Sequence, residues 1–360
     1  MPFLFFLNPC HLGNPANLSL CETIYHVPTF APIVVAASGS CAILHTRPEN
    51  MGRSEEIGIP LAQNRPECTR SPYRAFWAAA VIVVICFSGV LVDLIGHAFR
   101  ESLHSHILLV PFICGYLLWQ LRPDLPVPLR GGLAFAGITS GIGVAALGVF
   151  AIFRLSHVPI SNNDYLSLTV FAFCMFLYAA AGFFLGLPFL KAAAFPVAFL
   201  LVLVPLPDFV VNSLEIASQY ASAEVYSWFM NLTGATYFRE GRSFVLPTMT
   251  IIVAQECSGI RSSLVLFLTS LIAGHMFLST PWKKWALALA VFPLGIMRNA
   301  FRIYFLSMAS EHWDRSIIDS PLHHRGGPIF FALSLIPFFL LLIWLKKSDC
   351  NSVPPATAQS

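Results

Sequence analysis

Apolar runs long enough to cross a membrane recur along the chain, and no other feature limits its fold as strongly. The hydrocarbon core of a bilayer is about 30 Å thick, so one spanning helix needs about 20 mostly apolar residues. Hydrophobic residues make up 56% of the 360 residues and charged residues only 11%. Charged residues account for about a quarter of an ordinary soluble chain. The sequence therefore predicts an all-α polytopic membrane protein, because helices satisfy their own backbone hydrogen bonds in lipid.

About eight segments qualify as transmembrane helices, and two of them are short and contain proline. The expected spans cover residues 75–97, 106–121, 131–153, 165–187, 190–206, 260–279, 285–306 and 327–345. Residues 1–72 are polar, rich in turn-forming residues and without clear periodicity. They are either a disordered cytoplasmic tail or an extension upstream of a true start at Met51, and the residues leave both alternatives open. Residues 348–360 are expected to form a second cytoplasmic tail.

The loop charges predict an orientation, since short cytoplasmic loops are enriched in lysine and arginine. With eight spans, one set of alternate loops and flanks carries most of the isolated basic residues, namely Arg65, Arg70, Arg74, Arg122, Arg130, Lys191, Lys283, Lys284, Lys346 and Lys347. We expect this side, with both termini, to be cytoplasmic. The absence of a lysine- and arginine-rich block with interleaved aromatics argues against nucleic-acid binding.

The longest segment between expected spans, 207–259, lies on the opposite, extracytoplasmic side. Within residues 208–234, six positions recur at a spacing of three to four and predict an amphipathic helix on the outer membrane surface: Val211, Leu214, Ala217, Ala221, Val225 and Trp228. Residues 237–256 are rich in β-branched residues and contain a Glu-Gly turn and Pro247, which predicts a short hairpin. This hairpin leads to Cys257, at the start of the sixth span.

The same orientation brings three reactive side chains to the outer face. Cys257 lies at the start of the sixth span, Arg302 near the outer end of the seventh, and the pair His323 and His324 just before the eighth. A thiolate is a nucleophile favoured at a helix N-terminus, and an imidazole can take and return its proton. A guanidinium suits a developing oxyanion. Together they predict acyl transfer through a thioester.

Each of these residues also has an ordinary structural interpretation. A lone cysteine in a membrane helix is more often structural, and Arg302 suits headgroup anchoring or pairing with Glu311 or Asp314. Arg298 and Asn299 fit hydrogen bonding between helices equally well. Glu256 and Arg261 stay without an assigned role. The catalytic interpretation rests on the residues meeting at one membrane face.

The segments that carry these residues resemble the exosortase/archaeosortase family of multi-pass membrane cysteine transpeptidases. "ECSGIRSS" is similar to the family's nucleophile segment, "NAFRI" to its Asn-x-x-Arg-Ile segment, and "HHRGGPIFF" to its His-x-x-x-Gly-x-x-Phe-Phe segment. The resemblance implies Cys257 as nucleophile, Arg302 as catalytic arginine and His323 as catalytic histidine. Supporting roles would fall to His324, Asn299, Ser258 and Gly259. It covers residues 75–345, within an exosortase-like domain at 73–347.

Three positions depart from the family pattern. Ile107 replaces the usual glycine after His106, so His106 is given no catalytic role. Pro328 stands where an aromatic residue is common, and the pair of histidines leaves open which imidazole acts.

The resemblance also implies substrates: exported proteins with a C-terminal sorting signal, made of a Pro-Glu-Pro-like motif, a transmembrane stretch and a basic tail. The enzyme would cut near the motif at the periplasmic face of a bacterial cytoplasmic membrane and pass the product to an acceptor. A transporter, or a non-catalytic scaffold of an envelope polysaccharide system, is the alternative.

The cysteines and histidines predict neither a metal nor another cofactor. The nine cysteines form no CxxC pair and no zinc-type spacing, and the chain has no HExxH motif. Cys86, Cys114 and Cys174 lie in apolar runs, where cysteine usually behaves as a small hydrophobe.

Overall fold

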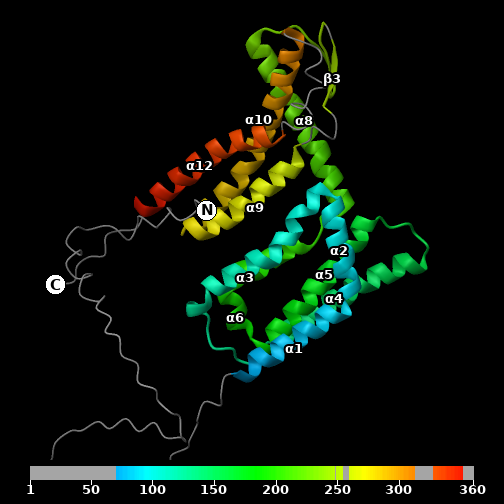
Figure 1. Cartoon of the computed structure of the whole chain (residues 1–360), viewed down its shortest axis with the longest axis vertical. Coiled ribbons are helices and arrows are strands. Elements are labelled where there is room, and N and C mark those ends of the chain that lie inside the picture. Colours follow the sequence, from blue (N-terminus) through cyan, green and yellow to red (C-terminus); the bar gives the residue numbers. More distant parts are fainter. Residues whose placement is uncertain (1–69, 248, 254–258, 313–326, 352–360) are drawn as a thin grey trace, which may run out of the picture. The chain divides into compact units, whose positions relative to one another are not determined.

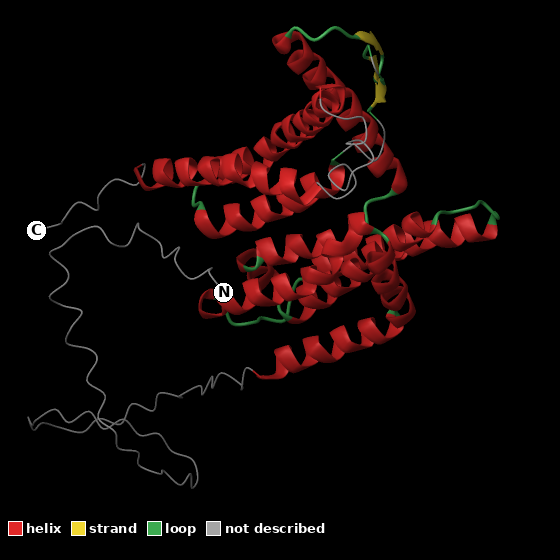
Figure 2. Ribbon diagram, turned by 45° about the horizontal axis from the view of Figure 1, so that its top comes forward, coloured by secondary structure: helices red, strands yellow, loops and turns green. Residues whose placement is uncertain are grey.

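The computed structural model describes residues 70–247, 249–253, 259–312 and 327–351. All described residues belong to one compact unit of the chain, which lies within Pro66–Ser360. Helices form nearly all of the described chain, with one small sheet beside them (Figure 2). The prediction of an all-α polytopic membrane protein is confirmed.

The first group of helices packs around α5 (Figure 1). Its elements are α1 (Arg70–Cys86), α2 (Ser88–Arg100), η3 (Ser102–Leu109), α3 (Val110–Gln120), η4 (Arg122–Asp124), α4 (Leu133–Leu155), α5 (Asn162–Phe184), α6 (Leu187–Ala192), α7 (Ala194–Leu200) and η5 (Leu201–Leu203). Leu166, Val170 and Cys174 of α5 are fully buried. Burial of these side chains explains why the α5 segment is apolar on almost every side.

The second group carries the motifs found in the sequence. It comprises α8 (Asp208–Thr233), β1 (Phe238–Glu240), β2 (Ser243–Val245), β3 (Thr250–Ile252), α9 (Ile260–Phe277), α10 (Pro281–His312) and α12 (Gly327–Asn351). Helices α9 and α12 both pack against α10 (Figure 1). Helix α12 runs past the expected end of the last span at residue 345.

The expected hairpin is present and gains a third strand. The sheet is antiparallel in the order β1-β2-β3. Glu240 pairs with Ser243 across a turn in which Gly241 has φ +61°, a conformation that favours glycine. Phe244 of β2 is fully buried and meets the ring of Tyr226 on α8 at a centroid distance of 4.6 Å. The sheet is thus fastened to α8 by an aromatic contact.

Within the described residues, six helices are long and apolar enough to cross a membrane, or up to eight if each of two bent pairs is one span. The expected first span is the pair α1 and α2, bent by 69°. The expected span at 190–206 is interrupted and divides into α6, α7 and η5. Prolines 196 and 205 explain the interruption, because proline lacks a backbone donor and restricts the residue before it.

Side chains of α5 hold the bend that leads into α8. The two helical segments on either side of this bend, Ala194–Leu203 and Asp208–Thr233, meet at 92°. The Asn163 Nδ2 donates to the Leu206 carbonyl at 2.6 Å and to the Asp208 carboxylate at 2.8 Å. The Ser167 hydroxyl donates to the Pro205 carbonyl at 2.8 Å. These bonds satisfy carbonyls that no helix ladder reaches, and they fix where α8 begins.

Helix α8 has two different faces. Tyr226 and Met230 are fully buried against the sheet and α10. Leu214 and Trp228, from the predicted apolar stripe, remain 42% and 54% exposed. The predicted helix is therefore present, but its protein-packing face is a different one from the stripe. Contact between that stripe and the membrane surface stays a prediction.

Candidate active site

The residues predicted to form the site divide between the described and the undescribed parts of the chain. Gly259, Asn299 and Arg302 are described. Cys257, Ser258, His323 and His324 lie outside the described residues, as does Glu256. The geometry of the site is therefore built from the segments that directly follow or flank these positions.

Gly259 starts helix α9 in a conformation that favours glycine. It is the N-cap residue, with φ +68° and ψ 7°, in the left-handed region. Its carbonyl accepts the Ser263 backbone N–H at 3.1 Å and the Ser262 hydroxyl at 3.0 Å. A Cβ at this position would lie 3.2 Å from both the Arg298 Nη2 and the Asn299 Oδ1. Glycine thus permits both the turn and the close approach to α10.

Two consecutive residues of α10 form hydrogen bonds with two different helices, α9 and α8. The Arg298 Nη2 donates to the Gly259 carbonyl at 3.1 Å and to the Ser263 hydroxyl at 3.4 Å, both at the start of α9. The Asn299 Nδ2 donates to the Ser222 hydroxyl of α8 at 3.0 Å. Asn299 is buried. This part of α10 therefore joins the segment after Cys257 to α8.

Arg302 lies one turn further along α10. Residues four apart share a helix face, and the charges of Arg298 and Arg302 act on each other. Arg302 is half-buried and Arg298 is buried. Two guanidinium groups thus follow each other along one face of α10, and the first of them, that of Arg298, contacts Gly259 at the start of α9.

The third motif reaches α10 through an aromatic side chain. Phe330, in the first described turns of α12, is buried and lies beside the rings of Phe301 and Phe305, at centroid distances of 6.4 Å and 6.2 Å. Phe301 and Phe305 flank Arg302 in the sequence. The helix that follows the histidine pair therefore packs at the same level of α10 as Arg302.

Helices α9 and α10 approach closely between these contacts. A Cβ on Gly295 would collide with the Ser263 side chain, so glycine allows the two backbones to come together. The sequence offered a signal for Arg298, whose spacing from Arg302 matches one helical turn. Ser222 and Ser263 carried no such signal, because nothing local distinguishes them from other small polar residues.

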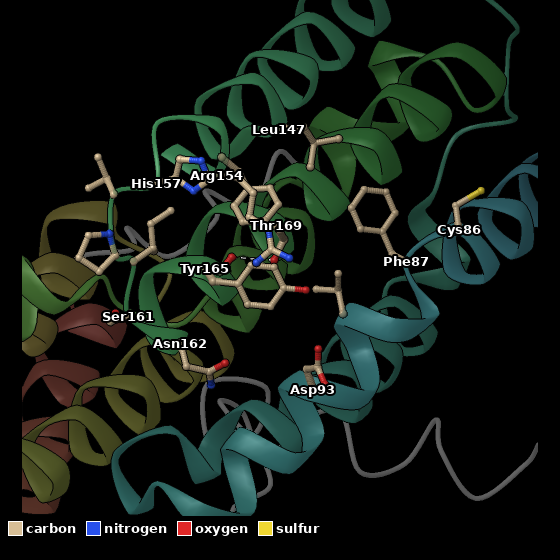
Figure 3. A pocket seen from close by; sticks show the side chains of 15 residues that line it. Cys86, Phe87, Asp93, Leu147, Arg154, His157, Ser161, Asn162, Tyr165 and Thr169 are labelled. Atoms are coloured by element: carbon tan, nitrogen blue, oxygen red, sulfur yellow. Dashed lines mark hydrogen bonds between the residues drawn. The ribbon is translucent and has the colours of Figure 1, made fainter. Parts of the chain in front are cut away.

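A large cavity lies apart from Gly259, Asn299 and Arg302, the described residues of the predicted site, none of which lines it. It has a volume of about 1200 Å³ and is lined from α1, α2, α4, α5 and the loop between α4 and α5. Figure 3 shows Tyr165 between Arg154 and Asp93. Cys86 lines this cavity and is exposed, whereas Cys114 and Cys174 are buried as small hydrophobes in the core.

The described residues contain no group of three or more histidine, cysteine or acidic side chains arranged to hold a metal ion. The described groups at the α9–α10 junction are the cations of α10, the hydroxyls of Ser262 and Ser263, and the N-terminus of α9. These groups favour an anion or a developing negative charge.

Comparison with known proteins identifies the family. The family model described as "Transmembrane exosortase" matches residues 98–340. No curated protein and no solved structure matches the chain. The matched region contains all three motifs and extends over more than half of the 360 residues. The chain therefore belongs to the transmembrane exosortase family.

Proposed function

We propose that this protein is a membrane-embedded cysteine transpeptidase or protease that cuts C-terminal sorting signals from exported proteins. The observation that carries the proposal is that three motifs, far apart in the chain, meet on α10. Gly259 contacts Arg298 and Asn299, and Phe330 contacts the two phenylalanines that flank Arg302. A site built from several helices at one level suits a multi-group reaction better than three unrelated structural residues.

The place of Cys257 in the sequence supports it as the nucleophile. Cys257 precedes Gly259, the N-cap residue of α9, by two positions. A helix N-terminus and a nearby guanidinium both favour the thiolate over the thiol.

The proposed reaction begins when the Cys257 thiolate attacks the scissile carbonyl. A C–S bond forms, and the negative charge on the carbonyl oxygen is stabilised by Arg302, the only arginine of the three motifs that the family resemblance makes catalytic. The peptide C–N bond then breaks, and the leaving amine takes the proton that His323 or His324 removed from the thiol. An acceptor amine or water finally releases the thioester.

We further propose a bacterial cytoplasmic membrane, with both termini cytoplasmic and the site at the periplasmic face. The support is the loop-charge bias of the sequence. A substrate anchored by its own transmembrane stretch would present the boundary of that stretch at the outer face. The recognition motif there would then lie at the depth of the α9 start.

The test is processing of a co-expressed exported protein that ends in a sorting signal of the Pro-Glu-Pro type. Cys257→Ala and Arg302→Gln are expected to lower the rate of cleavage by at least about 100-fold, since each removes a group needed in the transition state. Both variants should still insert. His323→Ala and His324→Ala decide which imidazole acts.

Cys86→Ala is the matched control, because Cys86 is an exposed thiol away from the motifs; it should process the substrate normally. Mass spectrometry of a trapped thioester on Cys257 would identify the cut site. Cleavage by Cys257→Ala at the unmodified rate would contradict the proposal.

A further inference from the structure

The large cavity between α1, α2, α4 and α5 has an apolar end and a polar end. Figure 3 shows Phe87 and Leu147 at one end, and Ser161 and Asn162 at the other. Helices α4 and α5 are each long and apolar enough to cross a membrane, so we expect the loop that joins them to lie at a membrane surface. The polar end belongs to this loop. The cavity therefore has the polarity of one leaflet, with its apolar end at the depth of the acyl chains.

The size of the cavity suits a lipid better than an ion or a small metabolite. Its volume of about 1200 Å³ exceeds that of ordinary small-molecule pockets, which hold about 300–1,000 Å³. Leu147 and Arg154 line it from the same helix, and the distance between them along the helix axis is about 10 Å at 1.5 Å per residue. One leaflet contributes about 15 Å of hydrocarbon to the bilayer. The cavity thus extends from the end of α4 through much of a leaflet.

Two side chains of opposite charge face the cavity without being paired. Asp93 comes from α2 and Arg154 from the last turn of α4. Tyr165 lies between them (Figure 3), and both charges act on its hydroxyl. Within the described residues, neither side chain forms a hydrogen bond or an ion pair, and the ion pairs found there join other residues. Ionised side chains at membrane depth are costly unless they have partners, so this pair points to a ligand that carries both charges.

The chemistry of the two groups defines the headgroup of that ligand. A guanidinium matches the geometry of a phosphate group and binds it through two parallel hydrogen bonds. An ionised carboxylate only accepts hydrogen bonds, so Asp93 requires a cation with N–H donors. A primary ammonium has such donors, whereas a quaternary ammonium has none. Phosphatidylethanolamine carries a phosphate and a primary ammonium on one headgroup.

We propose that this cavity binds phosphatidylethanolamine, with its phosphate on Arg154, its ammonium on Asp93 and an acyl chain against Phe87 and Leu147. The inference goes beyond the proposed function and does not depend on it, since the lipid takes part in no chemical step. It accounts for two charges that no described side chain neutralises.

The test measures lipid binding to the full-length protein, purified in detergent and freed of lipid. Dioleoyl phosphatidylethanolamine, phosphatidylglycerol and phosphatidylcholine are titrated separately, and bound lipid is quantified by native mass spectrometry. Phosphatidylglycerol has the phosphate without an amine, and phosphatidylcholine has methyl groups in place of the N–H donors. Phosphatidylethanolamine should bind about 10-fold more tightly than either, because a hydrogen bond to a charged group contributes about that factor.

Two charge variants assign the parts of the headgroup. Arg154→Gln should weaken the binding of all three lipids by about 10-fold, because each of them has a phosphate. Asp93→Asn should weaken the binding of phosphatidylethanolamine alone and so remove its advantage over the other two. The control is Arg100→Gln, which changes an exposed arginine at the end of α2 that does not line the cavity. It should leave all three affinities unchanged.

A third variant tests the place of the acyl chain. Leu147→Trp fills the apolar end of the cavity and should weaken the binding of all three lipids. Val149→Trp adds the same side chain to the same helix at an exposed position that does not line the cavity. This control should bind the lipids as the unmodified protein does.

Equal affinities of the unmodified protein for the three lipids would overturn the proposal, as would the absence of any lipid binding. The proposal is also wrong if Asp93→Asn keeps the preference for phosphatidylethanolamine, or if folded Leu147→Trp binds it as tightly as Val149→Trp does. Asp93 and Arg154 are both exposed, so their variants are expected to fold. They decide the question even if Leu147→Trp does not fold.

Discussion

At the scale of single residues, the start of α9 depends on the absence of a side chain at Gly259. Glycine is required there for two reasons. The backbone is left-handed, with φ +68°, and a Cβ atom would lie only 3.2 Å from the Arg298 Nη2. For Gly234, at the end of α8, only the first reason applies, with φ +69° and open space around its Cβ site. The two glycines therefore form a matched pair.

We expect Gly259→Ala to lower the free energy of unfolding more than Gly234→Ala does. Both variants bear the cost of the left-handed conformation, about 1–2 kcal/mol. Crowding of Arg298 and Asn299 should add about 1–3 kcal/mol for Gly259→Ala alone. Thermal unfolding in detergent compares the two, and substrate processing should fall only in Gly259→Ala. Equal destabilisation of the two variants would mean that Arg298 and Asn299 of α10 move away from the added Cβ at little cost in free energy.

At the scale of secondary-structure elements, α12 is tied to the α9–α10 turn by one carboxylate. The Asp349 Oδ2 accepts the Ser279 backbone N–H at 2.6 Å and the Ser279 hydroxyl at 2.7 Å. The Lys283 Nζ donates to the Asp349 Oδ1 at 3.2 Å, and the Thr280 hydroxyl donates to the same oxygen. Both charged side chains are almost completely buried. Asp349 thereby satisfies the backbone N–H groups of Ser279 and Thr280, the two residues that directly precede α10.

Asp349→Asn should therefore destabilise the protein by about 3–5 kcal/mol, because it leaves the buried Lys283 without its counter-charge. The control is Glu224→Gln, which breaks the ion pair with Arg239, in which the glutamate side chain is 69% exposed. Exposed pairs contribute little to stability, so this change should barely move the unfolding transition. Thermal unfolding compares the two variants. If Asp349→Asn lowers the free energy of unfolding as little as Glu224→Gln does, the ion pair of Lys283 and Asp349 does not stabilise the protein.

At the scale of the whole molecule, the orientation follows from counting crossings. Helices α9, α10 and α12 are each long and apolar enough to span a membrane. They separate the exposed Gly241 turn from the C-terminal end of the chain. If each of them crosses once, we expect three crossings, an odd number, which would place these two points on opposite sides of the membrane. This conclusion does not depend on how the two bent helix pairs are counted.

Alkaline phosphatase inserted at Gly241 is expected to be active, because the enzyme folds only after export. Green fluorescent protein attached after the C-terminus is expected to fluoresce, because Lys346 and Lys347 should keep that end in the cytoplasm. The same pair of fusions with the reporters exchanged is the control, and both exchanged fusions should be silent. The reverse pattern would place the candidate site at the cytoplasmic face.

Local chemistry accounts for what the sequence determined by itself. Whether a segment enters lipid depends on its own apolar surface, so the expected span at 131–153 lies close to α4 (Leu133–Leu155), and that at 260–279 close to α9 (Ile260–Phe277). The motif residues were recognisable for a similar reason, since their spacing within short segments carries the family pattern. The helical membrane fold and the family both followed from such short-range features.

Only the tertiary structure decided which distant groups meet. The bend before α8 depends on Asn163, and the burial of Tyr226 in place of Leu214 depends on the sheet that covers α8. The bond from Arg298 to Gly259 joins residues 39 positions apart. Hydrophobic burial has no direction, so apolar content cannot fix these pairings. Hydrogen bonds are directional, and they fix these pairings once the helices have packed.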